Sequence, residues 1–172
     1  KWTGDLSATY DYLLHAAPSF DGSSSLLSLT WDFGTVYLGD AVSPFGFSIF
    51  NAAGDRVGLD LDSINGSGNL AVLFADMTGF SGLAAGSQMD FSAFLDTSNL
   101  GDFFTSYTLN LSDANVGAAN SRSNYAMTLN LKGNVTAREA LQTNNVPEPT
   151  MLALVGIGLL GMNLSRRRQR AH

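Results

Sequence analysis

Histidine and cysteine, the residues most often used for nucleophilic and metal chemistry, are almost absent from this chain of 172 residues. There is no cysteine, which excludes disulfide frameworks, thiol nucleophiles and cysteine-ligated zinc. The only histidines are His15 and His172, too few for a multi-histidine metal site. No nucleophile-elbow pattern accompanies His15. The sequence therefore does not indicate a Ser-His-Asp hydrolase.

Acidic residues are the remaining candidates for catalysis. Residues 1–145 contain 14 of them, and 13 are aspartates, most of which stand beside Gly, Ser or Asn. Aspartate at such places usually caps a turn. A carboxylate pair for glycoside hydrolysis is therefore not indicated. We predict a non-enzymatic protein without a cofactor.

One stretch partly matches a calcium-binding loop. Asp60, Asp62 and Asn65 have oxygen-bearing side chains at close spacing, but Ile64 stands where a third oxygen ligand is needed. No glutamate closes the loop at its twelfth position. These three residues are calcium candidates, and the alternative is a strand and turn with surface aspartates. We predict no other metal site.

Charge is distributed unevenly along the chain. Residues 1–145 carry 5 basic and 14 acidic side chains, a formal charge of −9, whereas residues 146–172 carry four arginines and one glutamate, +3; together these give the net −6. An acidic body argues against nucleic-acid binding, which needs a basic face to neutralise phosphates. The basic tail instead indicates a membrane or targeting role.

The tail combines two prolines, an apolar run and an arginine cluster. Pro147 and Pro149 favour an extended entry to a helix that begins after them. A helix over Met151–Leu164 would be about 21 Å long, shorter than the roughly 30 Å hydrocarbon core of a bilayer. We predict that it enters the inner membrane transiently, with the C-terminus in the cytoplasm and the body outside; the alternative is a short core helix. The predicted membrane segment comprises Met151, Leu152, Leu154, Val155, Ile157, Leu159, Leu160 and Leu164, and the predicted topology signal comprises Arg166, Arg167, Arg168 and Arg170.

Residues 146–170 resemble the PEP-CTERM sorting segment of exported proteins of Gram-negative bacteria. The resemblance implies that an exosortase, a membrane protease-transpeptidase, recognises Val146, Pro147, Glu148 and Pro149. It further implies that cleavage removes the helix and sends the body to the cell surface or extracellular matrix. Such export needs an N-terminal signal. Because none begins the chain at Lys1, we expect a processed product or the C-terminal part of a longer protein.

The body is predicted to consist of short strands. Apolar residues alternate with polar or small ones most clearly over Tyr125–Val135 and Phe103–Leu111, the period of a strand with one buried face. Turn signals such as Asn51–Asp55 and Asn65–Gly68 separate these stretches from others. The other predicted strands lie within residues 26–33, 45–49, 57–64, 70–74 and 89–95. About seven short strands over residues 26–136 predict an all-β, immunoglobulin-like β-sandwich.

The segments outside the sandwich have separate assignments. Residues 137–145 are a predicted linker, and residues 146–172 form the sorting segment. Residues 1–25 are predicted to be an N-terminal strand and a connection. Because Trp2–Ala8 aligns without gaps with Leu131–Ala137, this strand either ends a preceding module in a tandem array or pairs with the sandwich edge.

A second resemblance lies at the start of the predicted sandwich. The sequence Trp31-Asp32-Phe33-Gly34-Thr35-Val36, with Gly39 and Asn51 after it, resembles the opening of bacterial Hydin-type, or choice-of-anchor, immunoglobulin-like modules. The resemblance extends over residues 26–135. It implies surface display and a binding or spacing role, with no catalytic residues.

Two functions of different classes follow. The first is a non-enzymatic surface or matrix protein with a structural or adhesive role that self-assembles through its sheet edges into homo-oligomers. The alternative is a module that binds exopolysaccharide. For the alternative, the aromatic side chains that either stack on sugar rings or pack on a strand face are Trp2, Tyr10, Tyr12 and Phe20.

Overall fold

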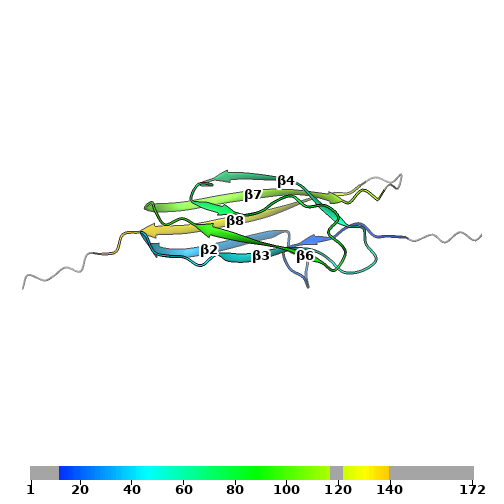
Figure 1. The fold of residues 1–172 in the computed structure, drawn as a ribbon, viewed down its shortest axis with the longest axis horizontal. Coiled ribbons are helices and arrows are strands. Elements are labelled where there is room, and N and C mark those ends of the chain that lie inside the picture. Colours follow the sequence, from blue (N-terminus) through cyan, green and yellow to red (C-terminus); the bar gives the residue numbers. More distant parts are fainter. Residues whose placement is uncertain (1–11, 117–121, 140–172) are drawn as a thin grey trace, which may run out of the picture. The chain divides into compact units, whose positions relative to one another are not determined.

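The computed structural model describes residues 12–116 and 122–139, and no helix is present in these two ranges. Figure 1 shows the long strands running alongside one another. The strands are β1 (Pro18–Ser19), β2 (Ser28–Tyr37), β3 (Phe45–Asn51), β4 (Leu59–Gly68), β5 (Leu73–Ala75), β6 (Gln88–Leu95), β7 (Gly101–Asp113) and β8 (Asn124–Thr136). Each of the seven predicted stretches overlaps one of these strands, and β1 is an addition. The prediction of an all-β sandwich is confirmed.

The strands form two four-stranded sheets. The first sheet has the order β1-β3-β6-β5 and the second has the order β2-β8-β7-β4. Neighbours are antiparallel except for β2 and β8, which are parallel. With β1, β3, β6 and β5 as strands A, B, E and D, and β4, β7 and β8 as C, F and G, this is the immunoglobulin order. The chain crosses from the first sheet to the second between β1 and β2, so its N-terminal part contributes to both.

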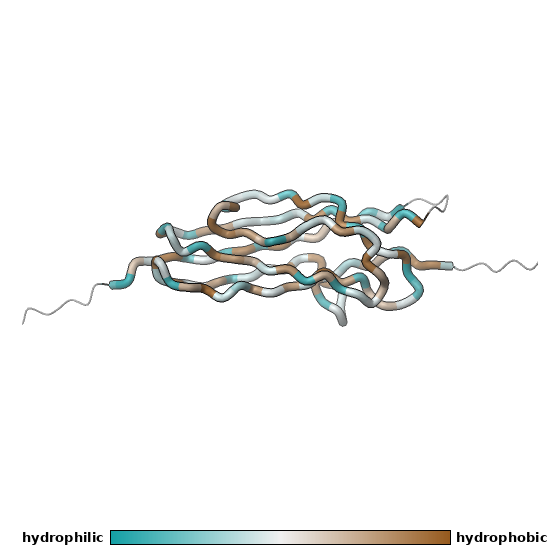
Figure 2. Tube along the Cα trace, viewed as in Figure 1, coloured by the Kyte–Doolittle hydropathy of each residue, from teal (hydrophilic) through white to brown (hydrophobic). Residues whose placement is uncertain are grey.

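The core lies between the two sheets, as the alternation of residues requires. On β7 and β8 every second side chain points inward, and Leu109, Leu129 and Leu131 are completely buried. Ile49 and Phe91 from the first sheet belong to the same cluster. Figure 2 shows hydrophobic and hydrophilic residues interspersed along the strands of both sheets. Truncating one of the buried leucines to alanine would cost about 2–5 kcal/mol, so these positions hold the sheets together.

An aromatic contact joins the two sheets along one side. The ring of Trp31 on β2 stacks on the ring of Phe45 on β3, with centroids 3.8 Å apart and planes 8° from parallel. Offset-stacked aromatic pairs add about 0.5–1.5 kcal/mol beyond the area they bury. The contact links the second sheet to the first where β2 and β3 lie near each other.

The turn predicted at Asn65–Gly68 is wrong, because β4 continues through these residues to Gly68. The glycines of this stretch do not reverse the chain; they allow neighbouring atoms to approach the backbone of β4 closely. A Cβ on Gly68, which has φ +93°, would lie 2.3 Å from the carbonyl oxygen of Phe104. A Cβ on Gly66 would lie 2.7 Å from Leu70 and 2.9 Å from Tyr107. Cross-strand pairing with β7 therefore overrides the local turn preference.

The described part of the N-terminal segment packs on the sandwich. Leu14 N donates to Asp55 O at 2.8 Å, and β1 pairs with the end of β3. Residues 1–8, which carry the internal similarity, lie outside the described residues. So do the sorting residues and the predicted apolar helix. Over 12–116 and 122–139, no helix capable of spanning a bilayer is found.

Candidate functional site

Asp113, at the end of β7, organises a polar cluster with His15. Asp113 is 4% exposed, and its Oδ2 lies 2.6 Å from His15 Nδ1. Ser123 Oγ lies 3.2 Å from the same Nδ1 atom. In a hydrolytic triad the acid and the serine bind opposite ring nitrogens. Here both address Nδ1, so the three residues are not arranged for proton transfer from serine to histidine.

Backbone groups complete the environment of Asp113. Its Oδ1 accepts hydrogen bonds from Ala16 N at 2.9 Å and Tyr125 OH at 3.0 Å, and its Oδ2 accepts one from Ser123 N at 2.8 Å. Burial raises the pKa of Asp113, but the bonds from Ser123, Ala16, His15 and Tyr125 outweigh burial and hold that pKa below its ordinary value. The cluster ties the N-terminal segment to the ends of β7 and β8.

The three calcium candidates do not form one site. Asp60 and Asn65 pair with Ser112 and Thr108 on β7, which places them about 14 Å apart along the strand at 3.4 Å per residue. The carboxylate of Asp60 is engaged by Gly82 N at 2.7 Å and by Arg122 at 2.8 Å. Asp62 and Asn65 are exposed on β4. β4 is extended over these residues, which agrees with the alternative of a strand with surface aspartates and not with a calcium loop.

The outward face of the second sheet carries rows of hydroxyl and amide side chains. Strand register places four residues side by side in each of two rows. One row is Thr30, Asn130, Ser106 and Ser67, and the next is Ser28, Thr128, Thr108 and Asn65. Within the first row Ser106 Oγ donates to Asn130 Oδ1 at 2.8 Å. All eight side chains are uncharged, and we call this surface the polar face.

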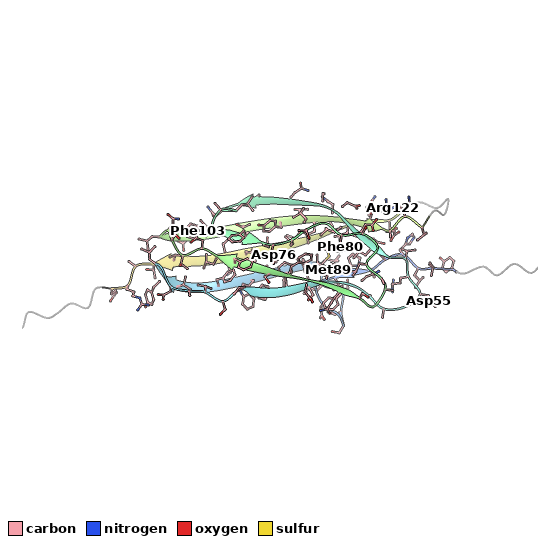
Figure 3. All side chains as sticks on the ribbon, in the orientation of Figure 1. Asp55, Asp76, Phe80, Met89, Phe103 and Arg122 are labelled. Atoms are coloured by element: carbon pink, nitrogen blue, oxygen red, sulfur yellow. The ribbon has the colours of Figure 1, made fainter. Side chains whose placement is uncertain are left out.

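A groove continues the polar face toward the end of the sheet where β7 begins, the end at which Figure 3 labels Phe103. It has a volume of about 380 Å³ and is lined by residues of β2, β7 and β8. A β-bulge between Asp32 and Thr35 shapes one wall. Gly34 adopts φ +72°, and its N–H donates to Asp32 Oδ1 at 2.8 Å.

The groove combines one exposed ring with fixed polar groups. Phe104 is 52% exposed. Asp32 lies 3.1 Å from Lys132, and Asp102 accepts a hydrogen bond from Asn134. Hydrogen bonds from Gly34 and Lys132 lower the pKa of Asp32, so this carboxylate acts as an acceptor at neutral pH. The groove can therefore offer an apolar ring face together with donors and acceptors.

The aromatic residues proposed for sugar stacking lie elsewhere. Phe20 is 8% exposed and packs edge-on against Phe47 in the core, so of its two alternatives packing is found and sugar stacking is not. Tyr12 is 85% exposed, and Trp2 and Tyr10 lie outside the described residues. The exposed ring in the groove, Phe104, was not predicted as a site residue. The alternation over Phe103–Leu111 would have placed it outward.

The edge of β4 is a second feature of the same sheet. Leu59 N donates to Leu83 O, and Leu61 N donates to Phe80 O, each at 2.9 Å, so a neighbouring segment covers the first half of the edge. Over the described part of the chain, nothing pairs with the outer side of β4 from Ser63 to Gly68. This stretch contains no charged residue and no proline.

Comparison with known proteins bears on the tail. A family model for the PEP-CTERM protein-sorting motif matches residues 145–169. The predicted sorting motif is thereby confirmed, and it indicates an exported surface protein that is sorted by an exosortase. No curated protein matches the chain. The resemblance of residues 26–135 to Hydin-type modules is consequently without support from any relative.

Proposed function

We propose that the protein is a non-enzymatic structural and adhesive module of the cell surface or extracellular matrix, and that copies associate through β4. The sorting motif supports location at the cell surface. The observation that carries the proposal is the unpaired, uncharged stretch Ser63–Gly68 at the edge of the second sheet. An unpaired strand edge is a template for pairing with another chain.

The other sheet edges differ from β4 in ways that oppose such pairing. β1 has two residues and β5 has three, and short edge strands offer few backbone groups to a partner. β2 carries the charged Asp32, and its Trp31 stacks across to β3. β4 also has a register shift, between Leu61 and Ser63, but it lies at the start of the uncharged stretch and not within it. Pairing of two β4 strands about a twofold axis would satisfy their unpaired backbone groups and close the interface on itself. We therefore expect a symmetric dimer.

The proposal assigns the Asp113 cluster a structural role, because its serine and its acid address the same histidine nitrogen and do not form a hydrolytic triad. The sorting segment fits delivery by the route that its motif indicates. The exosortase would act on Val146–Pro149 with the body outside the cell and the arginine cluster inside. The polar face favours a second function, glycan binding, which is developed in the next subsection.

Substitution on the two paired strands tests the association. Asn65 on β4 and Thr108 on β7 are directly opposite, exposed and on the same face. In N65K, each of the two paired edges would carry a lysine on the same face of the joined sheet, and these like charges would repel. T108K places the same charge one strand further from the edge and serves as the matched control.

Sedimentation of the full chain over a range of concentrations measures the result. We expect the parent chain and T108K to dimerise and N65K to remain monomeric. A parent chain that stays monomeric at every concentration would refute the proposal. So would N65K dimerising as readily as the parent.

A further inference from the structure

We infer that the polar face and its groove bind a neutral polysaccharide, with the ring of Phe104 as a stacking platform for one sugar. This inference goes beyond the proposed association of copies, because it concerns the outward face of the second sheet and not the edge. It rests on four observations: the uncharged rows, their spacing, the groove and the exposed ring.

The rows fit the chemistry of a sugar polymer. Serine and threonine hydroxyls both donate and accept hydrogen bonds, and asparagine amides do the same through two atoms. The hydroxyl groups of a sugar likewise both donate and accept hydrogen bonds, so they can pair with these side chains. Neighbouring side chains in a row are about 4.8 Å apart across strands, and the two rows are about 6.8 Å apart along them. An extended polymer lying over Thr30–Asn130–Ser106–Ser67 would meet a polar group at each strand.

Charge on this face selects a neutral ligand. The row beyond Thr30 and Asn130 contains Asp32 and Lys132, which form an ion pair with each other. The body as a whole is acidic, with −9 over residues 1–145. A polyanion would be repelled by the body and would find no unpaired cation on these rows. A polycation would find both carboxylates of the groove lining engaged, Asp32 by Lys132 and Asp102 by the amide of Asn134.

The groove supplies the anchor that a flat polar surface lacks. Its volume of about 380 Å³ lies within the range of about 300–1,000 Å³ typical of small-ligand sites. The exposed ring of Phe104 can cover the apolar face of a sugar. Asp32, Asp102 and Asn134 line the same groove as the ring and are held in place by Lys132, Gly34 and one another. Such preorganisation lowers the entropy that binding must overcome.

A protein partner fits this surface less well. The centre of a protein interface is usually rich in aromatic residues, methionine and arginine. The polar face instead carries only Ser, Thr and Asn in its two central rows. Phe104 is the single large apolar side chain of the described groove lining that is more than half exposed.

Affinity electrophoresis of the full chain tests the inference. The probes are three neutral polysaccharides, namely a soluble β-1,4-glucan, an α-1,4-glucan and a mannan, with the polyanion alginate as comparison. F104A removes the platform. F74A is the matched control, because Phe74 is 41% exposed, lies on β5 of the first sheet and stacks on Phe94. We expect retardation by at least one neutral polymer, at least fivefold weaker binding in F104A and unchanged binding in F74A.

A second variant tests the rows. N130D keeps the shape of Asn130 but adds a charge and removes a donor, so we expect weaker binding of polymer with little effect on a disaccharide held in the groove. The inference is overturned if no neutral polymer retards the chain, if alginate binds equally well, or if F104A and F74A behave alike. F104A should still dimerise, since Phe104 is not on the β4 edge. Loss of glycan binding is thereby separable from loss of self-association.

Discussion

Replacement of Asp113 by asparagine should destabilise the sandwich more than any exposed substitution. Its two carboxylate oxygens accept four hydrogen bonds, from Ala16 N, Tyr125 OH, Ser123 N and His15 Nδ1. In asparagine, one of the two carboxylate oxygens is replaced by an NH₂ group, which donates hydrogen bonds and does not accept them. In either orientation the NH₂ group faces a backbone N–H, of Ala16 or of Ser123, which then has no acceptor.

The expected magnitude follows from that count. An unsatisfied buried donor costs about 1–3 kcal/mol, and a hydrogen bond to a charged group contributes about 1.5–3 kcal/mol. Because the groups share one site, the losses do not add fully. We expect D113N to lower the free energy of unfolding by about 2–4 kcal/mol, a large fraction of the 5–15 kcal/mol of a typical domain.

Urea denaturation followed by circular dichroism measures this change. The midpoint should fall while the slope with urea stays the same, because the surface exposed on unfolding does not change. Asp55 is exposed, so D55N is the control that changes the same charge without loss of stability. A decrease below about 0.5 kcal/mol in D113N, within the usual range of surface substitutions, would refute this account of the cluster.

We also expect the contribution of Asp113 to the free energy of unfolding to depend on pH. The pKa of Asp113 is lower in the folded protein than its ordinary value. Its stabilising contribution is therefore complete above the unfolded value of about 3.9 and is lost as the pH falls through the folded value. The difference in stability between the parent and D113N should shrink below about pH 4. A difference that is constant from pH 7 to pH 3 would contradict the assigned ionisation.

Three further predictions concern other parts of the chain. Thr105 Oγ1 is buried without a hydrogen-bond partner, so T105V should raise the free energy of unfolding by about 1 kcal/mol in the same urea assay. G68A should lower it by on the order of 3 kcal/mol, because the φ of +93° disfavours any side chain and a Cβ would collide with Phe104 O. Replacing Arg166, Arg167 and Arg168 with Ser, or Pro147 and Pro149 with Ala, should abolish surface labelling of intact cells without changing thermal unfolding of the body; normal surface display would contradict the sorting assignment.

The sequence predicted the strands well because their alternation reflects burial on one face. Leu109, Leu129 and Leu131 are completely buried as that pattern requires. The prediction failed at Asn65–Gly68, where Gly66 and Gly68 make room for Leu70, Tyr107 and the backbone of Phe104. A single sequence does not distinguish a glycine that permits a turn from one that permits close packing.

The candidate sites were harder to predict because they depend on contacts between distant residues. His15 and Asp113 are 98 positions apart in the chain, and no local pattern marks their contact. The polar face depends on the register of four strands, including the parallel pair β2–β8. Alternation indicates which residues face outward, but only the register shows that Thr30, Asn130, Ser106 and Ser67 share a row.

The edge and the polar face make one joint prediction, because both belong to the second sheet. Antiparallel pairing of two β4 strands has its twofold axis perpendicular to the sheet, so the polar faces of both copies would lie on the same side. A long polysaccharide could then contact both copies at once, and its second contact would benefit from a high effective concentration. N65K should therefore weaken binding of a long neutral polymer by tenfold or more, within the roughly 10²–10⁴-fold range of avidity effects. N65K should leave disaccharide binding in the groove unchanged, because Asn65 is not among the residues that line the groove. Because Asn65 also belongs to the polar face, T108K, in the same row but on β7, is the control. Equal loss of polymer binding in N65K and T108K would show that Asn65 acts on the polar face itself and not through the dimer.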